Sequence, residues 1–181
     1  MSIIPDFRKK HTFCQVILTV RCTHSSIIVD DLQTQITRAQ AQTQTQSTPV
    51  AFFYLSHADR QAQTSHAVLS CLLRQVLEQV PSLPETVRAV YDTAQAKGGG
   101  ALSAFECERL LAEVLGELPR AYLVLDALDE CADEHRGSLL RTLGQLGQLR
   151  GVRVLVTSRP HVKFVSLTPC LHVTIPKGET N

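Results

Sequence analysis

Short runs of mainly apolar residues alternate along this chain with stretches of helical periodicity, and this alternation constrains the fold more than any other feature. The apolar runs span 50–55, 122–125 and 152–157. Each has the length of a strand and lacks a polar face, as in strands covered on both sides. Such strands, separated by amphipathic helices, indicate an α/β fold. We therefore expect a three-layer structure in which a parallel sheet is flanked by helices.

Apolar residues at helical spacing, together with residues that favour helix ends, predict four helices. These span 64–79, 85–96, 103–117 and 133–149. Ser103, followed three residues later by Glu106, forms the capping-box pattern at the start of the third helix. A final strand is predicted at 171–175. The stretch 34–48, rich in Gln and Thr, is expected either to continue a preceding helix or to form a solvated linker.

Composition argues against several classes of partner. The formal net charge of the 181 residues is +1, and there is no Trp. A near-neutral chain offers no electrostatic footprint for nucleic acid or an anionic membrane surface, and no segment reaches the ~20 apolar residues of a membrane span. Six cysteines are present without a Cys-x-x-Cys pair, and several lie in apolar segments as small hydrophobic residues. We therefore expect a cytoplasmic protein that binds neither nucleic acid nor membrane.

Three acidic residues follow the apolar run at 122–125. Asp126 comes directly at its end, and Asp129 and Glu130 follow three and four residues later. Ligands of parallel α/β sheets bind at the carboxyl ends of the strands. There, one carboxylate can hold Mg²⁺ while a second orients the water that attacks a phosphate. The alternative is a strand that leaves the core and meets a solvated acidic turn.

A cation follows the next apolar run. Ser158 follows the strand predicted at 152–157, and Arg159 and Pro160 come next. A cation at the tip of a neighbouring strand can reach a terminal phosphate and respond to its presence. Taken alone, the residue is better explained as an exposed Arg before a proline turn, but its position one helix after the acidic strand favours the phosphate sensor.

Together these segments resemble a known family. Tyr122–Cys131 (YLVLDALDEC) and Val154–Pro160 (VLVTSRP) look like the NACHT domain of the STAND class of P-loop NTPases. The closest likeness is to the nephrocystin-like N-terminal module of fungal multidomain proteins. Segment 51–75 resembles the second strand and following helix of that module, so the likeness covers about 25–175.

The resemblance implies specific roles. Asp126 would be the Walker B ligand of Mg²⁺ bound with ATP (or GTP), Asp129 and Glu130 would be the catalytic acids, and Arg159 would face the γ-phosphate. Proteins of this class are nucleotide-controlled signalling switches that hold ADP at rest, exchange it for ATP and oligomerise. Homotypic association with other NACHT-domain proteins is therefore expected.

One element of the family is missing. The phosphate-binding loop G-x-x-x-x-G-K-[ST] needs glycines and a lysine between the first strand and first helix, yet no glycine precedes Gly98. Residues 25–32 look like the helix that follows this loop, whereas Lys9 and Lys10 lie too far upstream to replace it.

Four segments are accordingly expected. They are a non-family segment at 1–24, a first helix with a Gln/Thr-rich linker at 25–49, the NTPase core at 50–176 and a truncated tail at 177–181. Either the gene model has lost the loop, or the domain is a degenerate pseudo-NTPase. Weak or absent ATP binding and hydrolysis are expected in both cases, and a non-catalytic scaffold that pairs with intact NACHT proteins is the alternative. If 1–24 does fold, 12–20 is expected to serve as the central first strand. Otherwise the P-loop NTPase-like sheet is expected to be incomplete: it lacks its middle, and the exposed edges of 50–55 and 122–125 favour aggregation.

Overall fold

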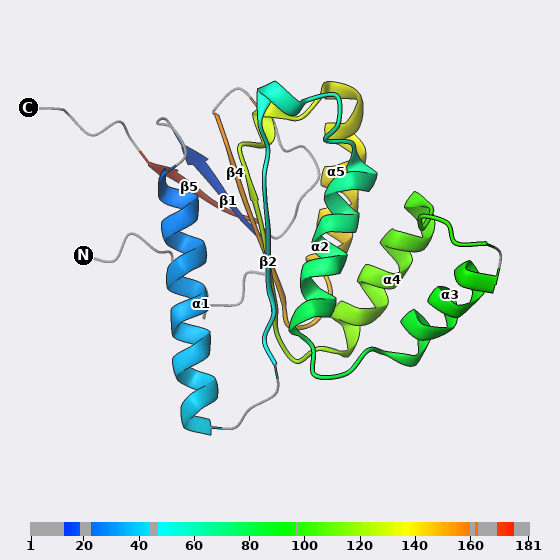
Figure 1. Ribbon diagram of the computed structural model, residues 1–181. Helices are drawn as coiled ribbons and strands as arrows, with labels where there is room; N and C mark the ends of the chain where they lie inside the picture. Colours follow the sequence, from blue (N-terminus) through cyan, green and yellow to red (C-terminus); the bar gives the residue numbers. More distant parts are fainter. Residues whose placement is uncertain are drawn as a thin grey trace, which may run out of the picture.

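The computed structural model describes residues 13–18, 23–43, 47–96, 98–159, 162 and 170–175. Within these ranges, strands and helices alternate along the chain (Figure 1). The elements in chain order are β1 (Phe13–Leu18), α1 (Thr23–Thr43), β2 (Val50–Tyr54), the 3₁₀ turn η1 (His57–Asp59), α2 (Ser65–Gln79), α3 (Glu85–Ala96), α4 (Ala104–Glu117), β3 (Ala121–Asp126), the 3₁₀ turn η2 (Leu128–Glu130), α5 (Asp133–Leu146), β4 (Val152–Ser158) and β5 (Cys170–Ile175).

The five strands form one parallel sheet in the order β2-β3-β4-β1-β5. Helix α1 lies on one face of the sheet, whereas α2, α4 and α5 lie on the other (Figure 1). This arrangement confirms the expected α/β class with a parallel sheet between helical layers. Because all strands run the same way, β2, β3 and β4 end at the same edge of the sheet.

The helix starts agree with the capping signals in the sequence. The Thr64 side chain accepts a hydrogen bond from the Ala67 N–H at the start of α2. Ser103 and Glu106 form the predicted capping box at the start of α4. Each cap satisfies N–H groups that the first helical turn leaves without a partner. The end of α5 was predicted too late, because the helix stops at Leu146 and Gly147 forms its C-cap.

Strand β1 occupies the interior of the sheet. It pairs with β4 through Phe13–Val154 to Ile17–Ser158 and with β5 on its other side. Residues 12–20 were expected to serve as a strand inside the sheet if the N-terminal segment folds, and residues 13–18 do so between β4 and β5. A domain boundary at residue 24 would divide β1 from these two strands, with which it pairs. The edges of 122–125 are not exposed, because β3 lies between β2 and β4.

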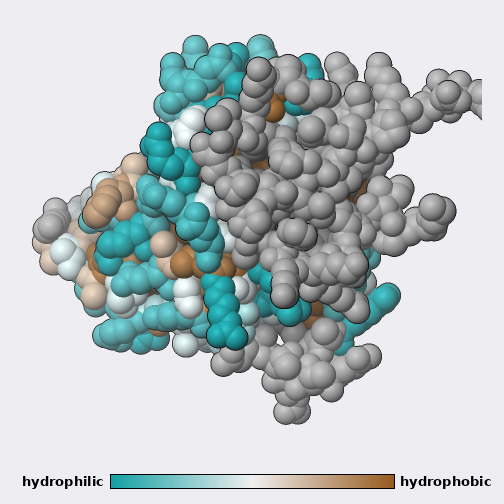
Figure 2. Space-filling model, turned by 180° about the vertical axis from the view of Figure 1, so that it is seen from behind, coloured by the Kyte–Doolittle hydropathy of each residue, from teal (hydrophilic) through white to brown (hydrophobic). Residues whose placement is uncertain are grey.

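Two apolar clusters hold the layers together. The larger one joins α2, α4 and α5 to one sheet face and includes wholly buried Leu72, Leu111 and Leu143. The smaller one joins Ile28, Val29 and Leu32 of α1 to Val50, Val124 and Leu155. Hydrophilic side chains predominate on the described part of the face in Figure 2, with smaller apolar areas between them. Helix α1 continues into the Gln/Thr-rich stretch as far as Thr43, and its partly buried Ile36 also packs against the smaller cluster.

Candidate functional site at the carboxyl edge of the sheet

The predicted site residues gather where β3 and β4 end. The two strands pair through Leu125 and Val156, so Asp126 and Thr157 come next to each other at the last step of the ladder. Asp126 is 2% exposed and Thr157 is 1% exposed. The Thr157 hydroxyl donates a hydrogen bond to Oδ1 of Asp126. A buried carboxylate without a partner is costly, and this hydroxyl supplies one.

The chain turns sharply directly after Asp126. Ala127 lies in the left-handed region (φ 57°, ψ 49°), which costs a non-glycine residue roughly 1–2 kcal/mol. Its N–H donates to Oγ1 of Thr157 at 2.9 Å. Leu128 then enters the core with no exposed surface. The spacing of the acidic motif follows from this anchor: Asp126 and Leu128 point inward, and the next two residues emerge at the sheet edge.

Asp129 and Glu130 both contact Arg159. The Arg159 backbone N–H donates to Oδ1 of Asp129 at 3.1 Å, and its Nε lies 3.1 Å from Oδ2 of the same carboxylate. Its Nη2 lies 3.3 Å from Oε1 of Glu130. The remaining oxygen, Oε2 of Glu130, accepts a hydrogen bond from the His57 N–H at 2.7 Å. Each of the four carboxylate oxygens therefore has a partner within the protein.

Arg136 clamps the turn that carries these acids. It donates to the carbonyl oxygens of Leu128, Asp129 and Cys131 at 3.2, 3.2 and 2.7 Å, and its Nη1 lies 2.7 Å from Oδ1 of Asp133. Burial raises the pKa of the Cys131 thiol, and the nearby positive charge of Arg136 only partly opposes this effect. Cys131 is thus a packing residue rather than a thiolate nucleophile.

The four predicted site residues are therefore brought together by the fold, at the ends of adjacent strands. Their roles in binding or catalysis stay predictions. Sequence reasoning assigned no function to Thr157 or Arg136. A polar residue directly after the apolar run Val154–Val156 of β4 was the available signal for Thr157, whereas nothing local in the sequence pointed to the carbonyl contacts of Arg136.

The residues present do not fit a tightly held Mg²⁺–nucleotide. Only Thr19–Cys22 separate the end of β1 from the start of α1, and this segment contains neither Gly nor Lys. The backbone cradle and the phosphate-binding lysine of a P-loop are thus missing from the sequence. Within the described ranges, no group of three or more His, Cys, Asp or Glu side chains could hold a metal ion. Lys9 and Lys10, which were assigned no role, lie outside the described residues.

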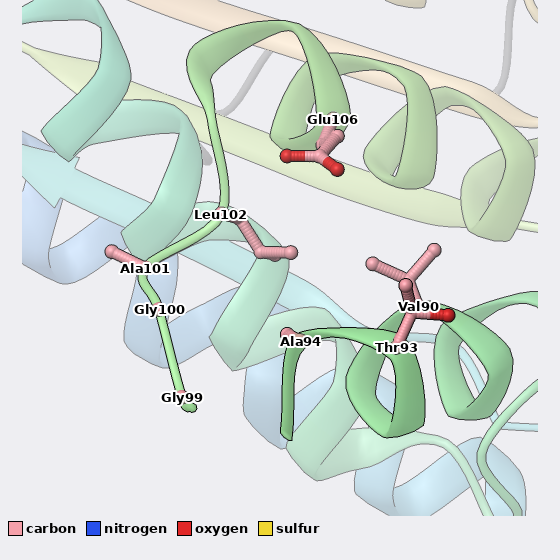
Figure 3. A pocket seen from close by; sticks show the side chains of 8 residues that line it. All are labelled: Val90, Thr93, Ala94, Gly99, Gly100, Ala101, Leu102 and Glu106. Atoms are coloured by element: carbon pink, nitrogen blue, oxygen red, sulfur yellow. The ribbon is translucent and has the colours of Figure 1, made fainter. Parts of the chain in front are cut away.

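A separate cavity of about 300 Å³ lies between α3 and the start of α4 (Figure 3). It is lined by Val90, Thr93, Ala94, Gly99, Gly100, Ala101, Leu102 and Glu106. None of these residues belongs to the strand ends, so the cavity is not part of the acidic site. In the part of the chain that the structure describes, no helix is long and apolar enough to cross a membrane.

A five-stranded parallel sheet between helical layers, with acidic residues at the end of an inner strand, defines a P-loop NTPase-like α/β protein. The sequence matches the family described as Nephrocystin 3, N-terminal, over residues 21–159. The chain therefore belongs to this nephrocystin-like family. The match begins after β1 and ends before β5, so both of these strands lie outside it. No curated protein matches the chain.

One solved structure supports the same fold class, and two others align less well. The ORC1 protein of Aeropyrum pernix, determined in complex with DNA, aligns with a TM-score of 0.56 at 15% identity, over 93% of this chain and 40% of that one. A Walker-type ATPase of Pyrococcus abyssi aligns at 13% identity with a TM-score of 0.48, over 82% and 41% of the two chains. The A. pernix ORC2 protein, in ADPNP–ADP complexes, aligns at 13% identity with a TM-score of 0.47, over 90% and 41%. This chain thus spans about two fifths of the length of these neighbours. The similarity of fold rests on the alignment with the ORC1 protein.

Proposed function

We propose that this chain is a nephrocystin-family module related to the NACHT switches of the STAND class, with the acidic half of a nucleotide site but without its phosphate-binding half. In this proposal Asp126 stands at the Walker B position of the Mg²⁺ ligand. Asp129 and Glu130 stand at the positions of the catalytic acids. The module binds Mg²⁺–ATP (or GTP) weakly or not at all and hydrolyses neither.

The observation that carries this proposal is the set of contacts around Asp129 and Glu130. An acid that orients or deprotonates water needs a carboxylate oxygen available to that water. Here three of the four oxygens accept hydrogen bonds from Arg159 or from the His57 N–H, and Oδ2 of Asp129 lies 3.1 Å from Nε of Arg159, so part of the acceptor capacity of both carboxylates is already used. The same contacts engage the guanidinium that would otherwise face a γ-phosphate. Since a P-loop contributes most of the interactions with the β- and γ-phosphates, nothing in this arrangement favours replacing the internal ion pairs by a nucleotide.

Titration of the 181-residue chain with fluorescent ATP and Mg²⁺ tests the proposal. We expect no saturable binding and no phosphate release above a protein-free blank. Asp126→Ala and the matched surface change Asp92→Ala should give the same flat titration. Saturable binding that is lost in Asp126→Ala but kept in Asp92→Ala would contradict the proposal, as would ATP hydrolysis that Glu130→Gln abolishes.

The second candidate function is a non-catalytic scaffold that pairs with intact NACHT proteins. It is favoured by the way Arg159 and Arg136 hold the ends of β3 and β4 in place through protein contacts alone, so that the surface needs no ligand to be formed. Co-sedimentation of the purified chain with a purified, full-length relative that has an intact P-loop tests this function. Association that is unchanged by Asp126→Ala would mean that the acidic site is vestigial, and absence of association would remove this candidate.

We also propose that nucleic acid is not a partner. The DNA complex belongs to the A. pernix ORC1 protein, of which this chain covers 40%, whereas the formal net charge here is only +1. A chain with so little positive charge neutralises few phosphates of a nucleic acid and should therefore bind it weakly. Fluorescence anisotropy with a labelled duplex at low salt should show no binding.

The free thiols of Cys71, Cys107 and Cys131 support the proposed cytoplasmic location, since reducing compartments preserve them.

A further inference from the structure

Strand β2 presents the sheet edge with the greatest hazard of association. It is the first strand in the sheet order, with β3 on its inner side. The segment 50–55 reads VAFFYL, without a charge, a proline or a glycine. Six-residue segments of this composition are prone to add further strands when their backbone is accessible. An edge of this kind needs a structural feature that prevents such pairing.

Two glutamines of α2 bond to the outer edge of β2. The Gln75 amide accepts from the Phe52 N–H at 3.0 Å and donates to the Phe52 carbonyl at 2.8 Å. The Gln79 amide does the same at Val50, at 3.0 and 2.9 Å. Each side chain therefore offers one acceptor and one donor to a single residue, as a peptide group of a neighbouring strand would.

The spacing of the pair explains why this works. Residues four apart on an α-helix are separated by about 6.0 Å along its axis. Alternate residues of a strand, whose N–H and C=O groups face the same edge, are separated by about 6.6 Å. The order is reversed, because Gln75 bonds to Phe52 and Gln79 to Val50, so α2 runs antiparallel to β2. One helical turn thus matches one strand repeat.

A third glutamine continues the pattern beyond the strand. The Ser56 N–H donates to Oε1 of Gln63 at 2.9 Å, and Gln63 is 8% exposed. Val50 and Phe52 face the same edge because they are two residues apart in the strand, and Ser56 lies two residues beyond the end of β2. Glutamine amides from two places along the chain therefore converge on one backbone edge.

We propose that Gln75 and Gln79 act as a substitute strand that shields β2, and that their loss converts this edge into a pairing surface for a second copy of the chain. A second copy is the occupant because it carries the same uncharged, strand-forming segment at the edge that the loss of the glutamines exposes. Two such edges can hydrogen-bond to each other across a two-fold axis. This inference does not depend on nucleotide binding.

The double variant Gln75→Met and Gln79→Met tests the proposal, because Met keeps the length of the side chain and removes both hydrogen-bonding groups. The matched control is Gln145→Met and Gln148→Met, which makes the same chemical change at exposed positions of α5 and the turn that follows it. Circular dichroism and thermal unfolding first establish that both variants are folded. Sedimentation velocity over a concentration series then measures association.

We expect the double variant to form a concentration-dependent dimer while the control sediments at the same rate as the unchanged chain. A lysine-flanked peptide with the Val50–Leu55 sequence should bind the double variant and not the control. A folded double variant that remains monomeric and ignores the peptide would overturn the proposal.

Hydrogen exchange in the unchanged chain provides a test that does not require the variant to fold. The amides of Val50 and Phe52 should exchange as slowly as those of Ala51 and Phe53, which face β3. In a folded variant at dilute concentration, the first two should exchange roughly tenfold faster, the equivalent of one lost hydrogen bond each. Loop-like exchange of Val50 and Phe52 in the unchanged chain would show that the glutamines do not shield this edge.

Discussion

Replacing Thr157 by Val removes a single buried hydroxyl and leaves two groups without their partner. Asp126 loses the hydrogen bond that it accepts at Oδ1, and the Ala127 N–H loses its acceptor. The shape of the side chain is nearly unchanged, so the packing of β4 is preserved. Each unsatisfied buried group costs about 1–3 kcal/mol. We therefore expect the free energy of unfolding to fall by roughly 2–6 kcal/mol, a large part of the 5–15 kcal/mol typical of a domain.

Urea unfolding followed by circular dichroism measures this change. For a chain of this size, a loss of about 3 kcal/mol corresponds to a decrease in Tm of roughly 6–12 °C. Thr93→Val is the matched control, because the Thr93 hydroxyl is exposed and bonds only to the Ala89 carbonyl. Its effect should stay within about 0.5 kcal/mol.

A double-mutant cycle tests the cause of the effect. When Asp126→Leu is combined with Thr157→Val, the loss should be smaller than the sum of the two single losses, because no buried carboxylate remains to be satisfied. If Thr157→Val proves as mild as Thr93→Val, or if the two losses simply add, the hydroxyl does not support Asp126 and the reasoning is refuted.

Two further predictions concern the backbone and the thiols. Gly151→Ala should destabilise the fold by roughly 2–4 kcal/mol, because its φ is +93° and an added Cβ would lie 2.4 Å from a backbone carbonyl oxygen. Gly137→Ala, in open space on α5, is the control and should be neutral or stabilising by up to about 1 kcal/mol. Equal urea midpoints for the two variants would contradict this prediction. Burial raises the pKa of the Cys107 and Cys131 thiols, so stability should be complete below the ordinary thiol pKa of 9.0 and fall as the pH rises through the raised values. Unfolding curves between pH 7 and pH 11 that coincide, or rapid alkylation of both thiols in the folded chain, would contradict the assignment.

Local patterns predicted most of the elements. The apolar runs and the capping residues identified β2, β3, β4 and four helices, because strand burial and helix capping depend on residues close in sequence. The later end predicted for α5 shows the limit of this approach, since Gly147 stops the helix although apolar residues continue to Leu149.

The contacts within the candidate site could be predicted only in part. The order of strands and acids placed Asp126 near Arg159, but the ion pairs of Arg159 with Asp129 and Glu130 depend on the turn at Ala127. A left-handed alanine has no sequence signature. Likewise, the bonds of Gln75 to Phe52 join residues 23 positions apart, and no pattern within α2 distinguishes this glutamine from one that faces solvent.

The place of β1 in the sheet has a consequence for synthesis. Both of its neighbours, β4 and β5, come from the last third of the chain. Between Leu18 and Ile175, 157 residues (175 minus 18) must be added before β1 has both partners. At about 5–20 residues per second, this strand waits on the order of 8–30 s on the ribosome. During that interval β1 cannot adopt its final pairing, whereas the segments α2, α3 and α4 can pack as each is completed.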